Sequence, residues 1–118
     1  MDVNERIRKQ LEGYPILLYM KGTPDFPQCG FSAKTVAALR SVNANFAYVN
    51  IFEDPEVREG LKSYSSWPTF PQLYVNGELI GGCDITMELF ESGELKEIVA
   101  QSGAAHASSG SAAGSESS

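Results

Sequence analysis

A short apolar run near the amino terminus restricts the fold more than any other feature of the chain. Ile16–Met20 is continuously apolar and follows Pro15. A run this short is typical of a strand buried on both faces of a sheet. Before it, apolar residues recur at every fourth position, at Val3, Ile7 and Leu11. This spacing predicts a helix that ends near Gly13.

Helical and extended patterns alternate along the rest of the domain. A second helix is expected to begin at or just after Cys29, and residues 46–51 favour a second strand. Asp54-Pro55 is a typical start for a third helix, with an N-cap followed by proline. Asn76-Gly77 is a strong hairpin signal between extended residues 72–75 and 78–80. Residues 85–99 favour a last helical region, interrupted near residues 92–93.

This order of elements predicts an α/β domain built on one sheet. Two strands joined through a helix form a parallel pair with a right-handed crossover. The hairpin adds antiparallel strands, which gives a four-stranded mixed sheet with helices on both faces. A cysteine motif beside a βαβ unit is typical of thioredoxin-like folds, although this motif lacks the usual second cysteine. We therefore predict a thioredoxin-like fold.

The domain is expected to span residues 1–101. Residues 102–118 are almost entirely Ser, Ala and Gly, and such a segment is expected to be disordered because it has too little apolar surface to bury. His106 lies within it, without neighbours that would complete a metal site. Two cysteines in 118 residues argue against a disulfide framework.

Charge and hydropathy exclude several classes of partner. Nine Lys and Arg against fifteen Asp and Glu give a net charge of −6, which is unfavourable for binding nucleic acid or an anionic membrane surface. No apolar run approaches the length of a membrane span. The first residues lack the pattern of a secretory or transit peptide, so we expect a cytoplasmic protein.

Cys29-Gly30-Phe31-Ser32 is the strongest chemical signal. Serine stands where a redox pair would place its second cysteine, so the site offers one sulfur. The unpaired N–H groups of a helix start stabilise a thiolate, and Lys21, at the end of the first strand, would add a positive charge.

Two further segments suggest a binding site. In Trp67-Pro68-Thr69-Phe70-Pro71-Gln72 the Phe70–Pro71 bond is expected to be cis, with the Phe70 backbone facing an extended peptide; alternatively, the prolines only break the loop. In Gly81-Gly82-Cys83-Asp84, Asp84 either caps a helix or pairs with a ligand ammonium.

Together these residues predict a slot for a small extended peptide. Lys21 and Arg58 would hold a carboxylate, the Phe70 backbone would pair with the middle of the peptide, and Cys83-Asp84 would hold a zwitterionic end. Arg58 contributes only if its helix face borders the Cys29 loop; otherwise it lies on a solvated face with Lys62. Glutathione has this charge layout.

The motifs resemble those of the monothiol glutaredoxins of the CGFS type, over about residues 3–100. The resemblance rests on the Lys21-Gly22-Thr23-Pro24, Cys29–Ser32, Trp67–Gln72 and Gly81–Asp84 segments at matching separations. The single-domain form is similar to the bacterial or organellar class.

The resemblance implies site residues and partners. It implies that Pro71 is the family's cis-proline and that Cys29 binds a 2Fe-2S cluster shared between two protomers. The predicted glutathione-binding residues are Lys21, Arg58, Phe70, Pro71, Cys83 and Asp84. The resemblance also implies transfer of clusters between donor and recipient iron–sulfur proteins, a role in iron homeostasis, and pairing with a BolA-like protein. Such a cluster needs four ligands, and two Cys29 thiolates with two glutathione thiols supply them.

Three alternatives to the cluster carrier stay open. The first is a glutathione-dependent oxidoreductase that removes glutathione from protein mixed disulfides through Cys29, for which the stiff Thr23–Pro27 loop is expected to allow at most weak activity. The second is an internal disulfide between Cys83 and Cys29. The third is a redox-inert adaptor that binds a BolA-like partner.

Overall fold

The computed structural model of the chain describes residues 2–102 and 110–111. The helices are α1 (Val3–Gly13), α2 (Gly30–Ser41), α3 (Pro55–Tyr64), α4 (Cys83–Ser92) and α5 (Glu94–Ser102). The strands are β1 (Ile16–Met20), β2 (Ala47–Asn50), β3 (Gln72–Val75), β4 (Glu78–Gly81) and β5 (Gly110–Ser111). The predicted order of helices and strands is confirmed through α5.

The strands form one mixed sheet in the order β4-β3-β1-β2-β5. β1 is parallel to β2 and antiparallel to β3, and β3 turns back into β4 through Asn76 and Gly77, which both have positive φ. The predicted parallel pair and hairpin are confirmed. The short β5 adds a fifth strand parallel to β2, which composition alone did not indicate. Most of the tail predicted to be disordered, residues 103–109 with His106 and residues 112–118, lies outside the described residues.

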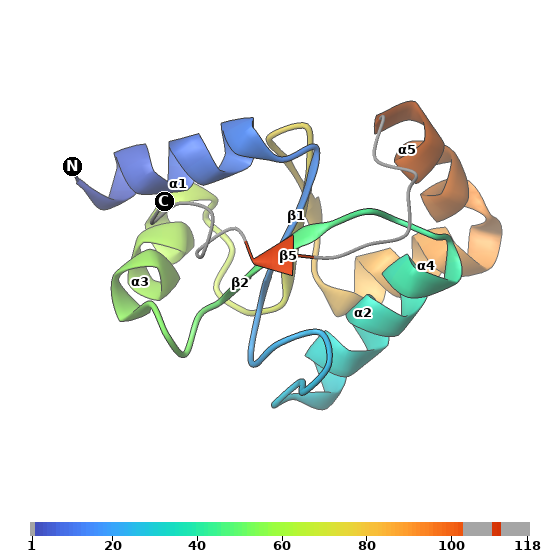
Figure 1. Cartoon of the computed structure of the whole chain (residues 1–118), viewed down its shortest axis with the longest axis horizontal. Coiled ribbons are helices and arrows are strands. Elements are labelled where there is room, and N and C mark those ends of the chain that lie inside the picture. The colour runs from blue at the N-terminus through green and yellow to red at the C-terminus, as the bar shows by residue number, and fades with distance from the viewer. Residues whose placement is uncertain (1, 103–109, 112–118) are drawn as a thin grey trace.

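Side chains of the central strand alternate between two hydrophobic cores. Ile16, Leu18 and Met20 pack in the core beneath α2, α4 and α5, whereas Leu17 and Tyr19 pack in the core beneath α1 and α3. This alternation is the two-residue period of a strand with both faces covered. Figure 1 shows the result as a layer of helices on each side of the sheet.

Two details of the helices differ from the prediction. α4 begins at Cys83, two residues before the predicted start at residue 85, and its N-cap is Gly82. Asp84 therefore does not cap this helix, but lies in its first turn. The predicted interruption is confirmed at Gly93, whose left-handed backbone (φ 86°) ends α4 before α5 begins. In the described part of the chain, no helix is both long and apolar enough to cross a membrane.

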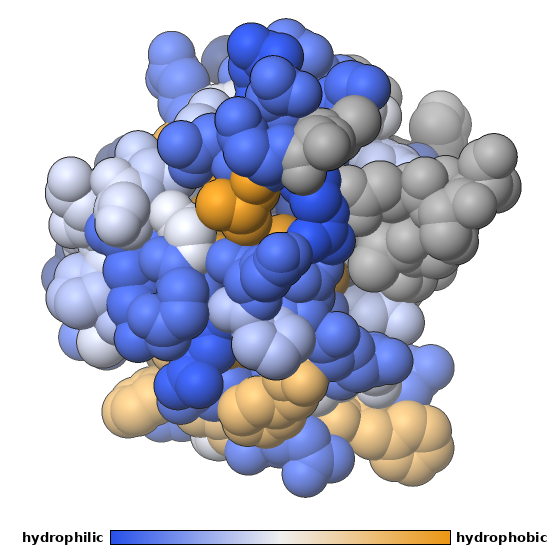
Figure 2. All heavy atoms as spheres, turned by 90° about the vertical axis from the view of Figure 1, so that its left-hand side faces the viewer, coloured by the Kyte–Doolittle hydropathy of each residue, from blue (hydrophilic) through white to orange (hydrophobic). Residues whose placement is uncertain are grey.

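Most of the face seen in Figure 2 is hydrophilic, and hydrophobic side chains gather along its lower edge. This edge is at the end of the molecule where Figure 1 shows the loop between β1 and α2. Exposed aromatic side chains of this loop and its surroundings include Phe26, Phe31 and Phe52. The apolar surface therefore lies at the end of the fold that carries Cys29.

Candidate functional site

Cys29 lies at the N-cap of α2, after the loop that follows β1. Its side chain is half-buried and its thiol is free. Strands β1 and β2 are parallel, so their carboxyl ends lie at the same edge of the sheet. A hydrogen bond joins these two ends, from Ile51 N–H just after β2 to the carbonyl of Met20 in β1, at 2.9 Å. The predicted position of Cys29 at a helix start is confirmed.

The pKa of the Cys29 thiol is lowered from its ordinary value. A hydrogen bond from the backbone N–H of Ser32 is the largest cause, and burial opposes it by raising the pKa. The N–H of Phe31, the charge of Lys21 and the Ser32 side chain lower the pKa further. The N–H groups of Phe31 and Ser32 belong to the first turn of α2, where backbone N–H groups favour an anion.

Ser32 does more than leave out a second thiol. Its side chain is fully buried, and its Oγ accepts a hydrogen bond from the backbone N–H of Lys21 at 3.1 Å. The end of β1 is thereby joined to the first turn of α2, close to Cys29. Sequence reasoning interpreted Ser32 only as a missing cysteine, although a small hydroxyl residue in the first turn of a helix was a signal for this kind of contact.

Backbone bonds fix the loop between β1 and α2. Gln28 N–H donates to Lys21 O at 2.9 Å, and Thr23 and Phe26 close a turn within the loop. Gly22 has φ +91°, and its N–H donates to Asn50 Oδ1 at 3.0 Å. A Cβ at Gly22 would lie 2.6 Å from both Gln28 N and Phe26 O, so this approach requires glycine.

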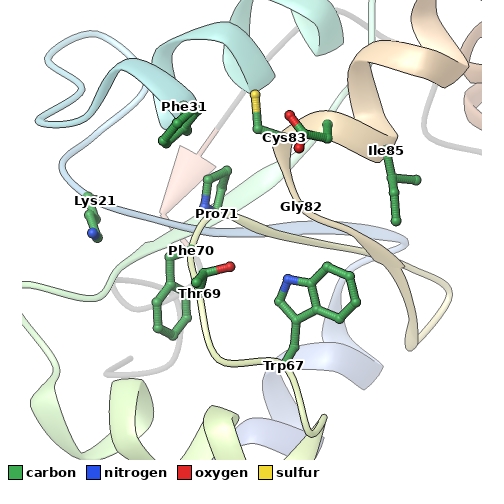
Figure 3. A pocket seen from close by; sticks show the side chains of 10 residues that line it. Lys21, Phe31, Trp67, Thr69, Phe70, Pro71, Gly82, Cys83 and Ile85 are labelled. Carbon is green, nitrogen blue, oxygen red and sulfur yellow. The ribbon is translucent and has the colours of Figure 1, made fainter.

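A cavity of about 430 Å³ opens beside this loop. Figure 3 shows Lys21 and Phe31 on one side of it, Cys83 and Ile85 on the other, and Pro71 between them. Its lining comprises Lys21, Phe31, Trp67, Thr69, Phe70, Pro71, Gly82, Cys83, Asp84 and Ile85. Five of the six predicted glutathione-binding residues thus line one cavity, and the Phe70–Pro71 bond is cis as expected.

Cys29 and Arg58 are not among the lining residues. Arg58 projects from α3, and its buried Nε has no hydrogen-bond partner in the described structure. Lys62, four residues along the same helix, pairs with Glu59 at 3.3 Å. The participation of Arg58 in the site stays a prediction.

The cavity also contains residues to which sequence reasoning gave no role. Phe31, Trp67, Thr69 and Ile85 belong to the lining. A Cβ at Gly82 would lie 3.2 Å from Pro71 O and 3.5 Å from Trp67 Nε1, so α4 starts in close contact with the loop before β3. Phe31, Trp67 and Thr69 belong to motifs that the sequence had already singled out, and this was the signal that could have identified them.

The charges of the cavity suit a zwitterion. Lys21 supplies a cation on one side, and exposed Asp84 supplies a carboxylate in the first turn of α4. The N–H groups at the start of a helix attract an anion. One end of a ligand can therefore place its carboxylate at this helix start and its ammonium at Asp84.

Cys29 and Cys83 are both free thiols. Within residues 2–102 and 110–111, no three His, Cys, Asp or Glu side chains come together in an arrangement that would hold a metal ion. Any metal bound through Cys29 would therefore need ligands from outside the described part of this chain.

Comparison with known proteins identifies the family. The glutaredoxin family profile matches residues 16–80. The chain is 54% identical over 99 residues to glutaredoxin 4 of Buchnera aphidicola subsp. Acyrthosiphon pisum. This match covers 84% of the chain and 92% of that protein. The chain is 50% identical over 104 residues to glutaredoxin 4 of Escherichia coli K12, and this match covers 88% of the chain and 90% of that protein.

The solution structure of reduced poplar apo GrxS14 resembles the fold with a TM-score of 0.74. It is 54% identical in sequence, and the match covers 85% of this chain and 92% of the poplar chain. Together with the lone Cys29 at the start of α2, these similarities show that the chain belongs to the glutaredoxin family, as a monothiol member.

Proposed function

We propose that this glutaredoxin binds glutathione and carries a labile 2Fe-2S cluster as cargo between two copies of the chain. The observation that carries the proposal is a single activated thiol, Cys29, beside a cavity with Lys21 on one side and Asp84 on the other. A carrier of this kind acts in cluster assembly and iron homeostasis.

The donor set fits a shared cluster. A 2Fe-2S cluster takes four ligands, normally thiolates. Cys29 supplies one per chain, and its lowered pKa favours the thiolate that iron requires. Two copies and two glutathione thiols complete the set. Because glutathione dissociates, such a cluster is removable, which suits transfer to a recipient protein.

The surface around Cys29 supports pairing of two copies. Phe31 follows Cys29 by two residues and is 57% exposed, and Phe26 precedes it by three and is 75% exposed. Aromatic side chains are enriched in the buried core of protein interfaces. A homodimer formed on the cluster would cover them.

Glutathione is assigned to the cavity. Lys21, Phe70, Pro71, Cys83 and Asp84 line it, and Arg58, with its unpartnered buried Nε, is proposed to join them on the carboxylate of the ligand. Iron–sulfur donors and recipients, and a BolA-like protein, are the proposed partners. A reducing compartment such as the cytoplasm suits a site whose two cysteines are free thiols.

Anaerobic reconstitution with ferrous iron, sulfide and glutathione tests this function. We expect a coloured dimer, seen in the visible spectrum and in native mass, that forms only when glutathione is present. Cys29→Ser is expected to give a colourless monomer, whereas Cys83→Ser keeps the cluster. Absence of colour in the native chain, or its loss in Cys83→Ser, contradicts the assignment.

The lowered pKa of Cys29 also favours a second candidate, removal of glutathione from protein mixed disulfides. The Cys29 thiolate attacks the glutathione sulfur and releases the substrate thiolate, and a second glutathione thiolate then attacks the new disulfide, releasing Cys29 and oxidised glutathione. Fast turnover of a glutathionylated protein by a chain that forms no cluster would establish this activity instead.

A further inference from the structure

Gln72, the first residue of β3, is fully buried directly behind the cavity wall. Its Nε2 donates two hydrogen bonds, to Trp67 O at 3.0 Å and to Thr69 O at 3.2 Å. A side-chain amide nitrogen has two N–H donors, so both are used on the loop that precedes β3. Trp67 and Thr69 line the cavity, whereas Gln72 itself does not.

The other end of the amide is held by the core. Tyr74 donates its hydroxyl to Gln72 Oε1 at 2.9 Å. The Tyr74 ring in turn packs edge-on against Tyr19 of the central strand, with ring centroids 5.5 Å apart. Ser65 Oγ also lies 3.3 Å from Gln72 Oε1, but makes its shorter bond, 2.7 Å, to Leu61 O. The Gln72 amide is thus oriented by Tyr74, a buried residue of the core.

Only a side chain with two donors and an acceptor satisfies all three partners. An apolar replacement leaves the carbonyls of Trp67 and Thr69 without these bonds, so the loop loses both of its hydrogen bonds to the Gln72 side chain and is free to rearrange. We propose that Gln72 is a positioning residue that fixes residues 67–71 in the conformation that binds glutathione. The proposed ligand rests on the proposed function; the fixing of the loop does not.

Trp67 gives a direct readout because it is the only tryptophan of the chain. The test variant is Gln72→Leu, and the matched control is Gln10→Leu. Gln10 is also a buried amide, 2% exposed, whose Oε1 accepts a hydrogen bond from Tyr19 at 2.8 Å, but it belongs to α1 and not to the strand that follows the loop. We expect acrylamide to quench Trp67 fluorescence at least about twofold more strongly in Gln72→Leu than in Gln10→Leu.

Calorimetric titration with reduced glutathione gives the second readout. If the loop of Gln72→Leu is in the binding conformation about a tenth of the time, the dissociation constant rises about tenfold. For Gln10→Leu it is expected to stay within about twofold of the native value. If Gln72→Leu does not fold, Tyr74→Phe takes its place. This variant removes the hydroxyl that donates to Gln72 Oε1 and keeps the ring. We expect it to raise both the quenching of Trp67 and the dissociation constant for glutathione, by less than Gln72→Leu would.

The outcomes separate the two ideas. Equal Trp67 quenching in the Gln72 and Gln10 variants, or equal loss of glutathione affinity, overturns the positioning role. If the native chain itself binds no glutathione, the proposed function fails, while the Trp67 comparison still decides whether Gln72 fixes the loop.

Discussion

Cys29 is activated largely by backbone groups, which are retained whatever side chain follows. The N–H of Ser32 is the largest cause of its lowered pKa, and the Ser32 side chain is the smallest of those acting in the same direction. Residue 32 therefore lowers the pKa of Cys29 mainly through its backbone, although its side chain is serine and not a second cysteine. What the serine adds is a buried oxygen for the N–H of Lys21.

This division of causes predicts the pH dependence of Cys29 alkylation. Only the thiolate reacts, so the rate should rise with pH through a midpoint below that of a free thiol, about 8.5, and fall away as pH drops below that midpoint. Ser32→Ala and Lys21→Met should each raise the midpoint, without bringing it to the free-thiol value, because the backbone N–H groups remain. Iodoacetamide rates measured in a Cys83→Ser background test this.

A midpoint in Ser32→Ala equal to that of a free thiol would contradict the backbone origin of the shift. A midpoint unchanged in both variants would show that neither Lys21 nor the Ser32 hydroxyl acts on the thiolate.

Among the elements, the loop between β1 and α2 depends on one conformation that L side chains rarely adopt. Gly22→Ala forces a Cβ to within 2.6 Å of backbone atoms at φ +91°. We expect the free energy of unfolding to fall by about 1–3 kcal/mol, the usual cost of strain at such a position. Urea denaturation measures it.

Gly13→Ala is the matched control for that loop. Gly13 is the last residue of α1, and a Cβ there meets no atom within 4 Å. Since alanine reduces the entropy of the unfolded chain, this variant should be as stable as the native protein or slightly more so. Equal destabilisation of both variants would show that the loop tolerates a side chain at Gly22.

At the scale of elements, sequence patterns predict most of the fold. The start of α3 at Asp54-Pro55 and the Asn76-Gly77 hairpin were recognisable because local chemistry fixes them. The start of α4 was not, since Gly82 caps it without a side-chain bond and Cys83 is buried by tertiary contacts. Short β5 has no pattern of its own; only its place beside β2 makes it a strand.

The candidate site divides in the same way. Residues with charge or an unusual backbone, such as Lys21, Asp84 and Pro71, could be predicted from motifs. Gln72 could not be given its role, because that role depends on which carbonyls face its amide after folding.

For the whole molecule, the sheet separates two cores that share no buried side chain. Val36 belongs to the core beneath α2, α4 and α5, and Val57 to the core beneath α1 and α3. Both side chains are almost fully buried. Substitutions in one core should therefore leave the packing of the other unchanged.

Val36→Ala and Val57→Ala test this independence. Each should lower the free energy of unfolding by about 1–3 kcal/mol through lost burial and a small cavity. In the double variant, the two losses should add to within about 0.5 kcal/mol, as for sites without shared partners. Urea denaturation of the native protein, the two single variants and the double variant measures the interaction term. A term well above that value would show that the cores are coupled through the sheet.

The alternation of β1 between these cores also limits how the gene for such a chain can vary in length. Insertion or deletion of one codon within Ile16–Met20 would exchange the side chains that face the two helical layers and shift Lys21 relative to Ser32. The exposed turn at Asn76 and Gly77 has no side chains that must alternate between two cores. Length variation and inserted tags are therefore expected to be tolerated at the hairpin, far from the thiol in sequence, and rejected in the central strand.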